Sequence, residues 1–291
     1  ASSLKALRRV AKPSAATLPM IGFGNPLLEG NQSHPQFSAH YKKQAKLARD
    51  NQRCPEAQRQ RVATSDGIRG GVAPVIMRDG LADLAHLKAQ LPLPETADEL
   101  CAVARDLKAG TREIRLGARA TEREVKALSL TGALARYRIV HFATHGALAG
   151  QLTGTTEPGL ILTPPATASQ EDDGYLSASE IAGLKFDADW VILSACNTAG
   201  GGATSAEALS GLARAFFYAQ ARALLVSHWE VDSAATIKLI SSAVRAMTAD
   251  SSVGRAEALR RSMLALIGDA DPLAAHPAYW APFVVVGEGA R

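Results

Sequence analysis

Residues 137–146 read YRIVHFATHG, and residues 190–202 read WVILSACNTAGGG. Each stretch opens with a short apolar run, which is typical of a buried strand. A reactive side chain follows each run directly, His145 after the first and Cys196 after the second. Sites in open α/β sheets form beyond the carboxyl ends of the strands. The two stretches therefore predict a sheet with a histidine and a cysteine at the mouths of two of its strands.

The segments around these runs alternate between strand-like and helix-like patterns. Four S/T-x-x-E sequences, which are typical of helix N-termini, begin at Thr96, Thr121, Ser177 and Thr204. Two further helices are predicted at 232–248 and 254–267, and strands at 18–24, 114–116, 137–144, 159–163, 190–195, 223–227 and 283–286. This alternation predicts an α/β fold, a three-layer sandwich with a mostly parallel sheet flanked by helices.

The composition suits one large domain with a basic N-terminal part. The 291 residues are 47% hydrophobic, which is enough for a sizeable core, and we interpret residues 1–291 as one domain. Residues 31–70 are polar and rich in Gln, and we expect a flexible insertion with one exposed helix. Residues 1–70 hold 12 Lys and Arg against 4 Asp and Glu (+8), and the rest holds 20 against 24 (−4). A solvated surface is favoured over nucleic-acid binding, because interleaved aromatic side chains are missing.

The cysteine pattern and the absence of other motifs limit the class of protein and its compartment. The three cysteines, at positions 54, 101 and 196, are not closely spaced. This argues against a disulfide scaffold and for a reducing compartment, and we expect a cytoplasmic location. The sequence has no zinc spacing, no nucleotide-binding glycine motif and no apolar run of about 18 residues, so we expect no metal, no cofactor and no membrane span. The acidic stretch 171–173 could attract calcium, but a solvated loop is favoured.

A cysteine and a histidine at two strand ends suit nucleophilic catalysis. A free thiol, with a pKa of about 8.5, is a modest nucleophile at neutral pH, and an imidazole can take its proton. The N–H of Gly146 could hold an oxyanion together with the N–H of Cys196. Taken alone, a cysteine after a strand is more often a core residue, and His141, inside the first run, is interpreted as a core histidine.

Five ordered motifs resemble those of CHAT-domain proteins, the bacterial relatives of caspases and separases. They are residues 139–146 (IVHFATHG), 191–199 (VILSACNTA), 205–216 (SAEALSGLARAF), 226–232 (VSHWEVD) and 280–286 (WAPFVVV). The interval between His145 and Cys196, 196 − 145 = 51 residues, is also close to the ~50 residues of caspases. The resemblance covers residues 94–290, and 18–26 more loosely, whereas residues 31–70 match no motif.

The resemblance implies a caspase-like cysteine endopeptidase that cleaves protein or peptide substrates through an acyl-enzyme. Cys196 is then the nucleophile and His145 the base, with no cofactor required. No side chain that would orient His145 is identified, and a backbone carbonyl could serve. CHAT domains commonly follow tetratricopeptide repeats, so the resemblance also implies an N-terminal repeat region or a regulatory protein as a partner.

The specificity of such an enzyme is not that of a caspase. Residues 194–198 read SACNT rather than Gln-Ala-Cys-Arg-Gly, so a preference for acidic residues is not implied. The stretch after residue 227 is similar to a separase segment whose acidic residue receives an arginine side chain. Asp232 is the best match, Glu230 is second, and His228 could line the same cleft. We expect cleavage after a basic residue, although Asp232 could equally cap the helix that follows.

Two other functions stay open. The same fold could be a catalytically silent scaffold that binds proteins, and thiol alkylation separates this function from catalysis. Less well supported is a nucleic-acid-binding module formed by residues 1–70, for which salt-dependent retention on DNA is the test.

Overall fold

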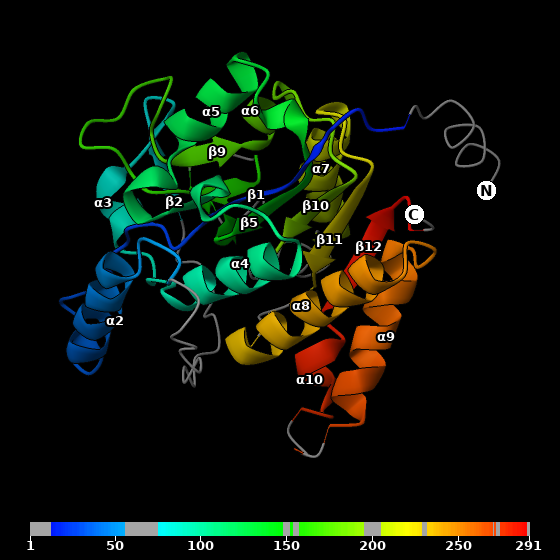
Figure 1. The fold of residues 1–291 in the computed structure, drawn as a ribbon. Helices are drawn as coiled ribbons and strands as arrows, with labels where there is room; N and C mark the ends of the chain where they lie inside the picture. Colours follow the sequence, from blue (N-terminus) through cyan, green and yellow to red (C-terminus); the bar gives the residue numbers. More distant parts are fainter. Residues whose placement is uncertain are drawn as a thin grey trace.

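The computed structural model describes residues 13–55, 75–147, 152–153, 157–194, 205–228, 232–269, 271 and 274–289. Within this part of the chain, helices cover both faces of a six-stranded central sheet (Figure 1). The sheet order is β4-β1-β5-β10-β11-β12. The strands are β1 (Leu18–Gly24), β4 (Ile114–Leu116), β5 (Tyr137–Ala143), β10 (Trp190–Leu193), β11 (Ala223–Ser227) and β12 (Phe283–Gly287).

The sheet is parallel except at one edge. Every neighbouring pair runs parallel apart from β11 and β12, which are antiparallel. The predicted α/β class with a mostly parallel sheet is therefore confirmed. The sequence pattern located these strands well because β1, β5, β10 and β11 are apolar and almost entirely buried.

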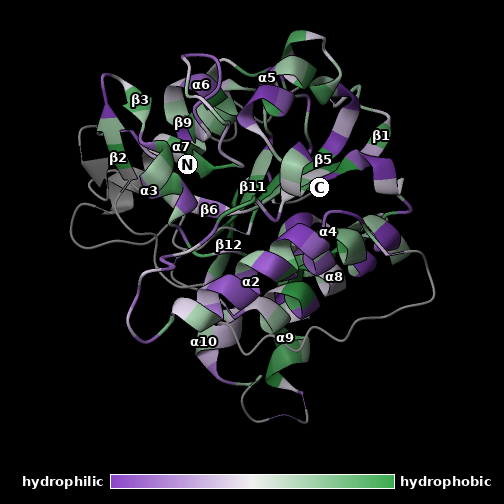
Figure 2. Ribbon diagram, turned by 90° about the vertical axis from the view of Figure 1, so that its left-hand side faces the viewer, coloured by the Kyte–Doolittle hydropathy of each residue, from purple (hydrophilic) through white to green (hydrophobic). Residues whose placement is uncertain are grey.

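Alternate side chains of the strands feed two separate cores. One core packs the sheet against α4 (Glu95–Asp106), α8 (Ser233–Ala249) and α9 (Arg255–Ile267). The other packs it against α5 (Glu122–Leu130), α6 (Ala178–Ala182) and α7 (Ser205–Tyr218). In β10, for example, Ile192 belongs to the first core and Val191 to the second. Figure 2 shows the mainly hydrophobic strands β5 and β11 between helices that mix hydrophilic and hydrophobic residues. This arrangement is the predicted three-layer sandwich.

Two small sheets lie beside the central one. The first is the antiparallel sheet β6 (His145–Ala147), β8 (Gly159–Ile161) and β9 (Tyr175–Ser177), and β8 lies within the strand predicted at 159–163. The second contains β2 (Val75–Arg78), β3 (Leu81–Ala82) and β7 (Leu152–Thr153). Asp79 and Gly80 join β2 to β3 with φ of 52° and 81°, the left-handed backbone that tight hairpin turns require.

The predicted helix starts were correct in part. Ser177 and Glu180 form a complete capping box before α6. Thr121 caps α5 through the N–H of Glu124, and α5 ends at Leu130. The remaining helices are α2 (Ser38–Asp50), α3 (Leu84–Lys88) and α10 (Pro277–Trp280), and 3₁₀ turns cover Thr111–Glu113, Gly117–Arg119 and Leu134–Arg136.

The capping box predicted at Thr96 and Glu99 is wrong. The helix α4 begins at Glu95, directly after Pro94. The hydroxyl of Thr96 donates to the carbonyl of Leu93 and accepts from the N–H of Asn25. Glu99 is fully buried and does not act as a cap. A tertiary contact, described below, has overridden the local signal.

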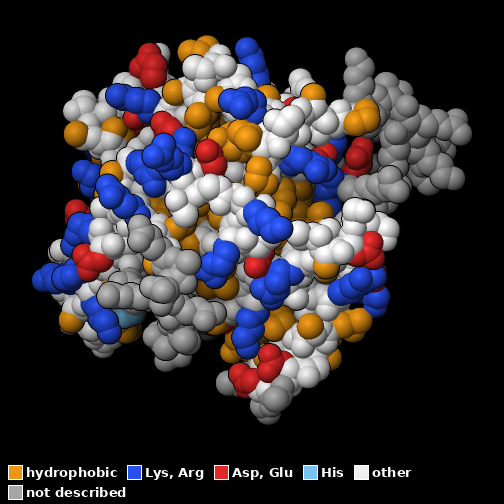
Figure 3. Space-filling model, viewed as in Figure 1, with side chains coloured by type: hydrophobic (Ala, Val, Ile, Leu, Met, Phe, Trp, Pro, Cys, Tyr) orange, Lys and Arg blue, Asp and Glu red, His pale blue; other side chains and the backbone are white. Residues whose placement is uncertain are grey.

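The basic N-terminal part contains the predicted exposed helix. In α2 only Ala45 and Ala48 are buried, and Lys46 pairs with Asp50 within the helix. Residues 56–74, which include the rest of the predicted insertion, lie outside the described residues. On the face of the molecule that Figure 3 shows, the Lys and Arg side chains are interspersed with acidic and apolar ones and do not form one stripe.

A disulfide joins Cys54, after α2, to Cys101 of α4, with 5.5 Å between the Cα atoms. The wide cysteine spacing, from which we argued against a disulfide scaffold, therefore did not exclude a disulfide. The two residues are 47 apart in sequence, and distance along the chain carries no information about distance in space. Cysteine spacing consequently no longer argues for a reducing compartment. In the described part of the chain, no helix is long and apolar enough to cross a membrane.

Candidate active site

The strands that lead to His145 and Cys196 are neighbours in the sheet. β5 and β10 run parallel, and Phe142 is paired with Leu193. His145 lies three residues after Phe142, and Cys196 lies three residues after Leu193 (142 + 3 = 145 and 193 + 3 = 196). Adjacent strands are ~4.8 Å apart, so the two strands end side by side at the same edge of the sheet. Cys196 itself lies outside the described residues.

His145 is held by a backbone carbonyl. Its side chain is fully buried, and Nε2 lies 2.7 Å from the carbonyl oxygen of Leu91, in the segment before α4. A carbonyl only accepts hydrogen bonds, so this contact requires the proton on Nε2. In the neutral ring Nδ1 is then the basic nitrogen. The sequence could not identify this partner because a main-chain carbonyl has no residue-type signature.

The segment after β5 is fixed by the small antiparallel sheet. His145 and Gly146 are paired with Ile161 and Leu160 of β8. The hydroxyl of Thr144 donates to the carbonyl of Ile161. Gly146 is buried within this pairing. The strand β8 therefore holds the backbone on both sides of the histidine.

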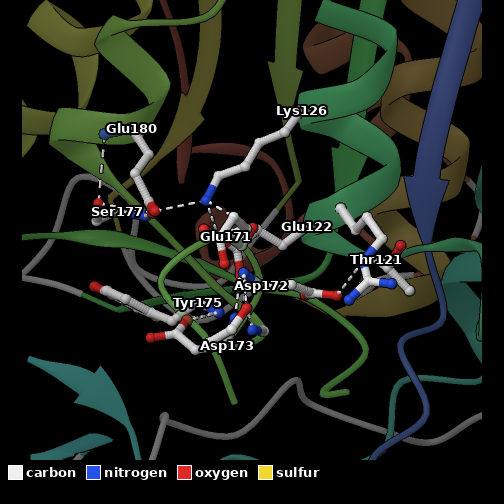
Figure 4. Close-up of polar contacts among 12 residues, drawn as sticks. Thr121, Glu122, Lys126, Glu171, Asp172, Asp173, Tyr175, Ser177 and Glu180 are labelled. Carbon is white, nitrogen blue, oxygen red and sulfur yellow. Dashed lines mark hydrogen bonds and ion pairs between the residues drawn. The ribbon is translucent and has the colours of Figure 1, made fainter. Parts of the chain in front are cut away.

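A buried acidic network anchors the outer strand of the same sheet (Figure 4). Glu122 accepts hydrogen bonds from the N–H groups of Asp173 and Gly174, each at 2.8 Å. Lys126 bridges Glu122 and Glu180. Asp173 accepts from the N–H groups of Ala82 and Tyr175, at 2.7 and 2.9 Å. The carboxylates thus tie α5 to the start of β9.

The structure divides the acidic stretch 171–173 into an exposed and a buried part. Glu171 is exposed, as expected of a solvated loop, whereas Asp172 and Asp173 are only 4% and 7% exposed. The described residues contain no group of three or more His, Cys, Asp or Glu arranged to hold a metal ion. Burial raises the pKa of Glu122 from 4.5 to about 7 and also raises the pKa of Asp173. Burial alone would lower the pKa of Lys126, but its hydrogen bonds to Glu122 and Glu180 raise it.

His141 is a core histidine, as the sequence predicted, and it has two buried partners. Its Nε2 lies 2.8 Å from Oε1 of Glu99 and 3.0 Å from Oγ of Ser194. All three residues are fully buried. The glutamate comes from α4 and the serine from the end of β10. Sequence reasoning missed this cluster because it assigned Glu99 to a helix cap.

The segment predicted to contact substrate follows the neighbouring strand. β11 is parallel to β10, so this segment follows the strand next to the one that leads to Cys196. His228 is half-buried, and its N–H donates to the carbonyl of Pro282. Asp232 caps α8 by accepting from the N–H of Ala235 at 2.8 Å. Glu230 lies outside the described residues.

The disulfide also singles out one thiol. The chain has three cysteines, and Cys54 and Cys101 bond to each other. Cys196 is therefore the one cysteine of the sequence that is not part of this bond. This assignment comes from the pairing of the other two and needs no geometry at residue 196.

A family model described as the CHAT domain matches residues 1–288, which is essentially the whole chain. The chain belongs to the CHAT domain family. CHAT domains are related to the caspase-like cysteine peptidases, in agreement with the layered α/β fold. The chain is also 28% identical over 231 residues to "Tetratricopeptide repeat protein 28" of Mus musculus. The match covers 69% of this chain and 9% of that much longer relative.

Proposed function

We propose that this CHAT domain, residues 1–291, is a cysteine endopeptidase with Cys196 as nucleophile and His145 as general base. The observation that carries the proposal is the Leu91 carbonyl at Nε2 of His145, which follows β5, the strand paired with β10. In the sequence, β10 leads directly to Cys196. Orientation of a catalytic base by a third group is the usual arrangement in nucleophilic catalysis. No cofactor enters the proposed mechanism.

In the proposed reaction, the sulfur of Cys196 attacks the scissile carbonyl while Nδ1 of His145 accepts the thiol proton. The tetrahedral oxyanion is held by the N–H groups of Gly146 and Cys196. His145 then gives the proton to the leaving amine as the C–N bond breaks, which yields an acyl-enzyme and the free amine. A water molecule, deprotonated by His145, hydrolyses the thioester and restores the thiol. The carbonyl of Leu91 keeps Nε2 protonated throughout, so Nδ1 performs both transfers.

The proposed specificity is for a basic residue before the scissile bond. Asp232 uses Oδ1 to cap α8, so Oδ2 is the atom that would meet a guanidinium. A carboxylate that also caps a helix is held in one orientation, which suits the geometry of an arginine. Glu230 and His228 are further candidates for lining the same cleft.

Tetratricopeptide repeats are the proposed context of the domain. The name of the mouse relative refers to such repeats, and the match covers only a small part of that protein. A repeat region or a regulatory protein would then present substrates to the CHAT domain.

A peptide library tests the proposal. The wild type should cleave a subset of peptides, with the cleavage sites identified by mass spectrometry, and Cys196→Ala should cleave none of them. A protein that binds partners but cleaves no peptide, with Cys196 as slow to alkylate as free cysteine, would instead be a silent scaffold. Retention on DNA that decreases with salt, without peptide cleavage, would support the nucleic-acid-binding alternative.

A further inference from the structure

Three polar residues meet inside an otherwise apolar part of the sheet. Glu99 on α4, His141 in β5 and Ser194 at the end of β10 are each 0% exposed. The Nε2 atom of His141 contacts both partners, at 2.8 Å from Oε1 of Glu99 and 3.0 Å from Oγ of Ser194.

Stability alone does not explain this cluster. Desolvation of a carboxylate and an imidazole is costly, and apolar residues of similar volume often replace a buried ion pair without loss of stability. The neighbours of His141 along β5 are Val140 and Phe142, and both are fully buried apolar residues. An apolar side chain at position 141 would continue this pattern. We therefore expect the polar cluster to fix the relative positions of β5, β10 and α4.

The placement of the cluster identifies that role. The register pairs His141 with Ile192, so the contact from His141 to Ser194 runs diagonally across β5 and β10. His141 is four residues before His145, and Ser194 is two residues before Cys196. The N–H of Ser194 also donates to the carbonyl of Phe142 at 3.1 Å, which extends the pairing to the last described residue of this segment.

Glu99 links the same cluster to the element that orients the base. It lies on α4, and the segment directly before α4 supplies the Leu91 carbonyl at 2.7 Å from His145. The 2.8 Å contact between Glu99 and His141 therefore ties α4 to β5, and the helix in turn holds the Leu91 segment near the sheet edge. One side chain, His141, thus connects the strand of the base, the strand of the nucleophile and the helix behind both.

We propose that Glu99, His141 and Ser194 form a buried positioning chain that sets Cys196 relative to His145. None of the three touches substrate, so they are positioning residues. The proposal rests on the proposed function, in which Cys196 and His145 act together. A misplacement of about 1 Å at such a pair can cost about 100-fold in rate. Loss of the chain should therefore lower reactivity more than stability.

The test measures the thiol directly. With the Cys54–Cys101 bond intact, iodoacetamide should modify Cys196 alone, and its rate is followed across a pH series by intact mass. Ser194→Ala removes the link to β10. Its matched control is Ser262→Ala, which removes another buried hydroxyl, one that donates to the carbonyl of Leu239 at 2.6 Å between α8 and α9. We expect Ser194→Ala to slow alkylation at least about tenfold, with the control at the wild-type rate.

A second variant separates positioning from stability. Replacing Glu99 and His141 together by Leu removes the pair without leaving a lone buried charge, so we expect folding to be unimpaired and alkylation to be slowed as in Ser194→Ala. If this variant does not fold, Ser194→Ala against its control decides. Wild-type alkylation rates at every pH in Ser194→Ala would overturn the proposal. A wild type that is activated toward iodoacetamide but cleaves no peptide would instead refute the proposed function alone.

Discussion

Reduction of the Cys54–Cys101 bond should destabilise the domain substantially. The bond closes a loop with a sequence separation of 47 and ties the segment after α2 to α4. In the chain-entropy model, releasing a loop of this length costs about 4 kcal/mol of unfolding free energy at 25 °C. With a urea slope of about 3 kcal/mol/M, the unfolding midpoint should fall by about 1.3 M.

The assay is urea unfolding followed by circular dichroism, with and without a phosphine reductant. Cys54→Ser, which cannot form the bond, is the control, and its midpoint should not respond to the reductant. Cys196 is already a thiol in this account, so reduction changes only one bond in the wild type. A wild-type midpoint that is the same in both conditions would refute the reasoning, because it would mean that the two cysteines are not bonded or that the loop is ordered without the bond.

The remaining predictions concern the dyad, specificity and pH. His145→Ala should lower kcat/KM for a cleaved peptide at least ~100-fold without unfolding the domain, and a smaller loss in steady-state kinetics would argue against a general base at this position. Asp232→Asn keeps an oxygen to cap α8 but removes the charge. The value of kcat/KM should therefore fall about 10- to 100-fold for Arg peptides and stay level for neutral ones. An unchanged kcat/KM for Arg peptides would reject the pocket. Burial raises the pKa of Glu122 to about 7. Between pH 4.5 and 7 the folded state therefore keeps a proton on Glu122 that the unfolded state loses. The free energy of unfolding should consequently fall by at most about 3 kcal/mol as pH rises through this range. Urea unfolding across this pH range should show a flatter dependence in Glu122→Gln, and an equal slope in both proteins would contradict the assignment.

Much of the sheet could be predicted from the sequence because its signals are local. The strands β1, β4 and β11 begin and end at the predicted residues. The strand β10 ends two residues earlier than expected, where Ser194 turns its hydroxyl to His141. Burial on both faces leaves strands of this kind little room for polar side chains, so the run itself marks the element.

The parts that could not be predicted depend on contacts between distant segments. Glu99 follows Thr96 at the spacing of a helix cap, but its side chain meets His141, 42 residues further along the chain (141 − 99 = 42). Cys54 and Cys101 meet through the packing of the segment after α2 against α4. The partner of His145 is a main-chain carbonyl, and every residue has one. Neither propensity nor periodicity carries information about such meetings.

The central claim is that Cys196 becomes acylated by substrate. The direct measurement is to mix the protein with a peptide ester that carries Arg at the acyl position, stop the reaction in acid within seconds, and read the intact mass. Digestion then locates the added acyl group. The account predicts one acyl group on the peptide that contains Cys196, and none in Cys196→Ala. An acyl group on another residue, or ester turnover that persists in Cys196→Ala, would contradict the account.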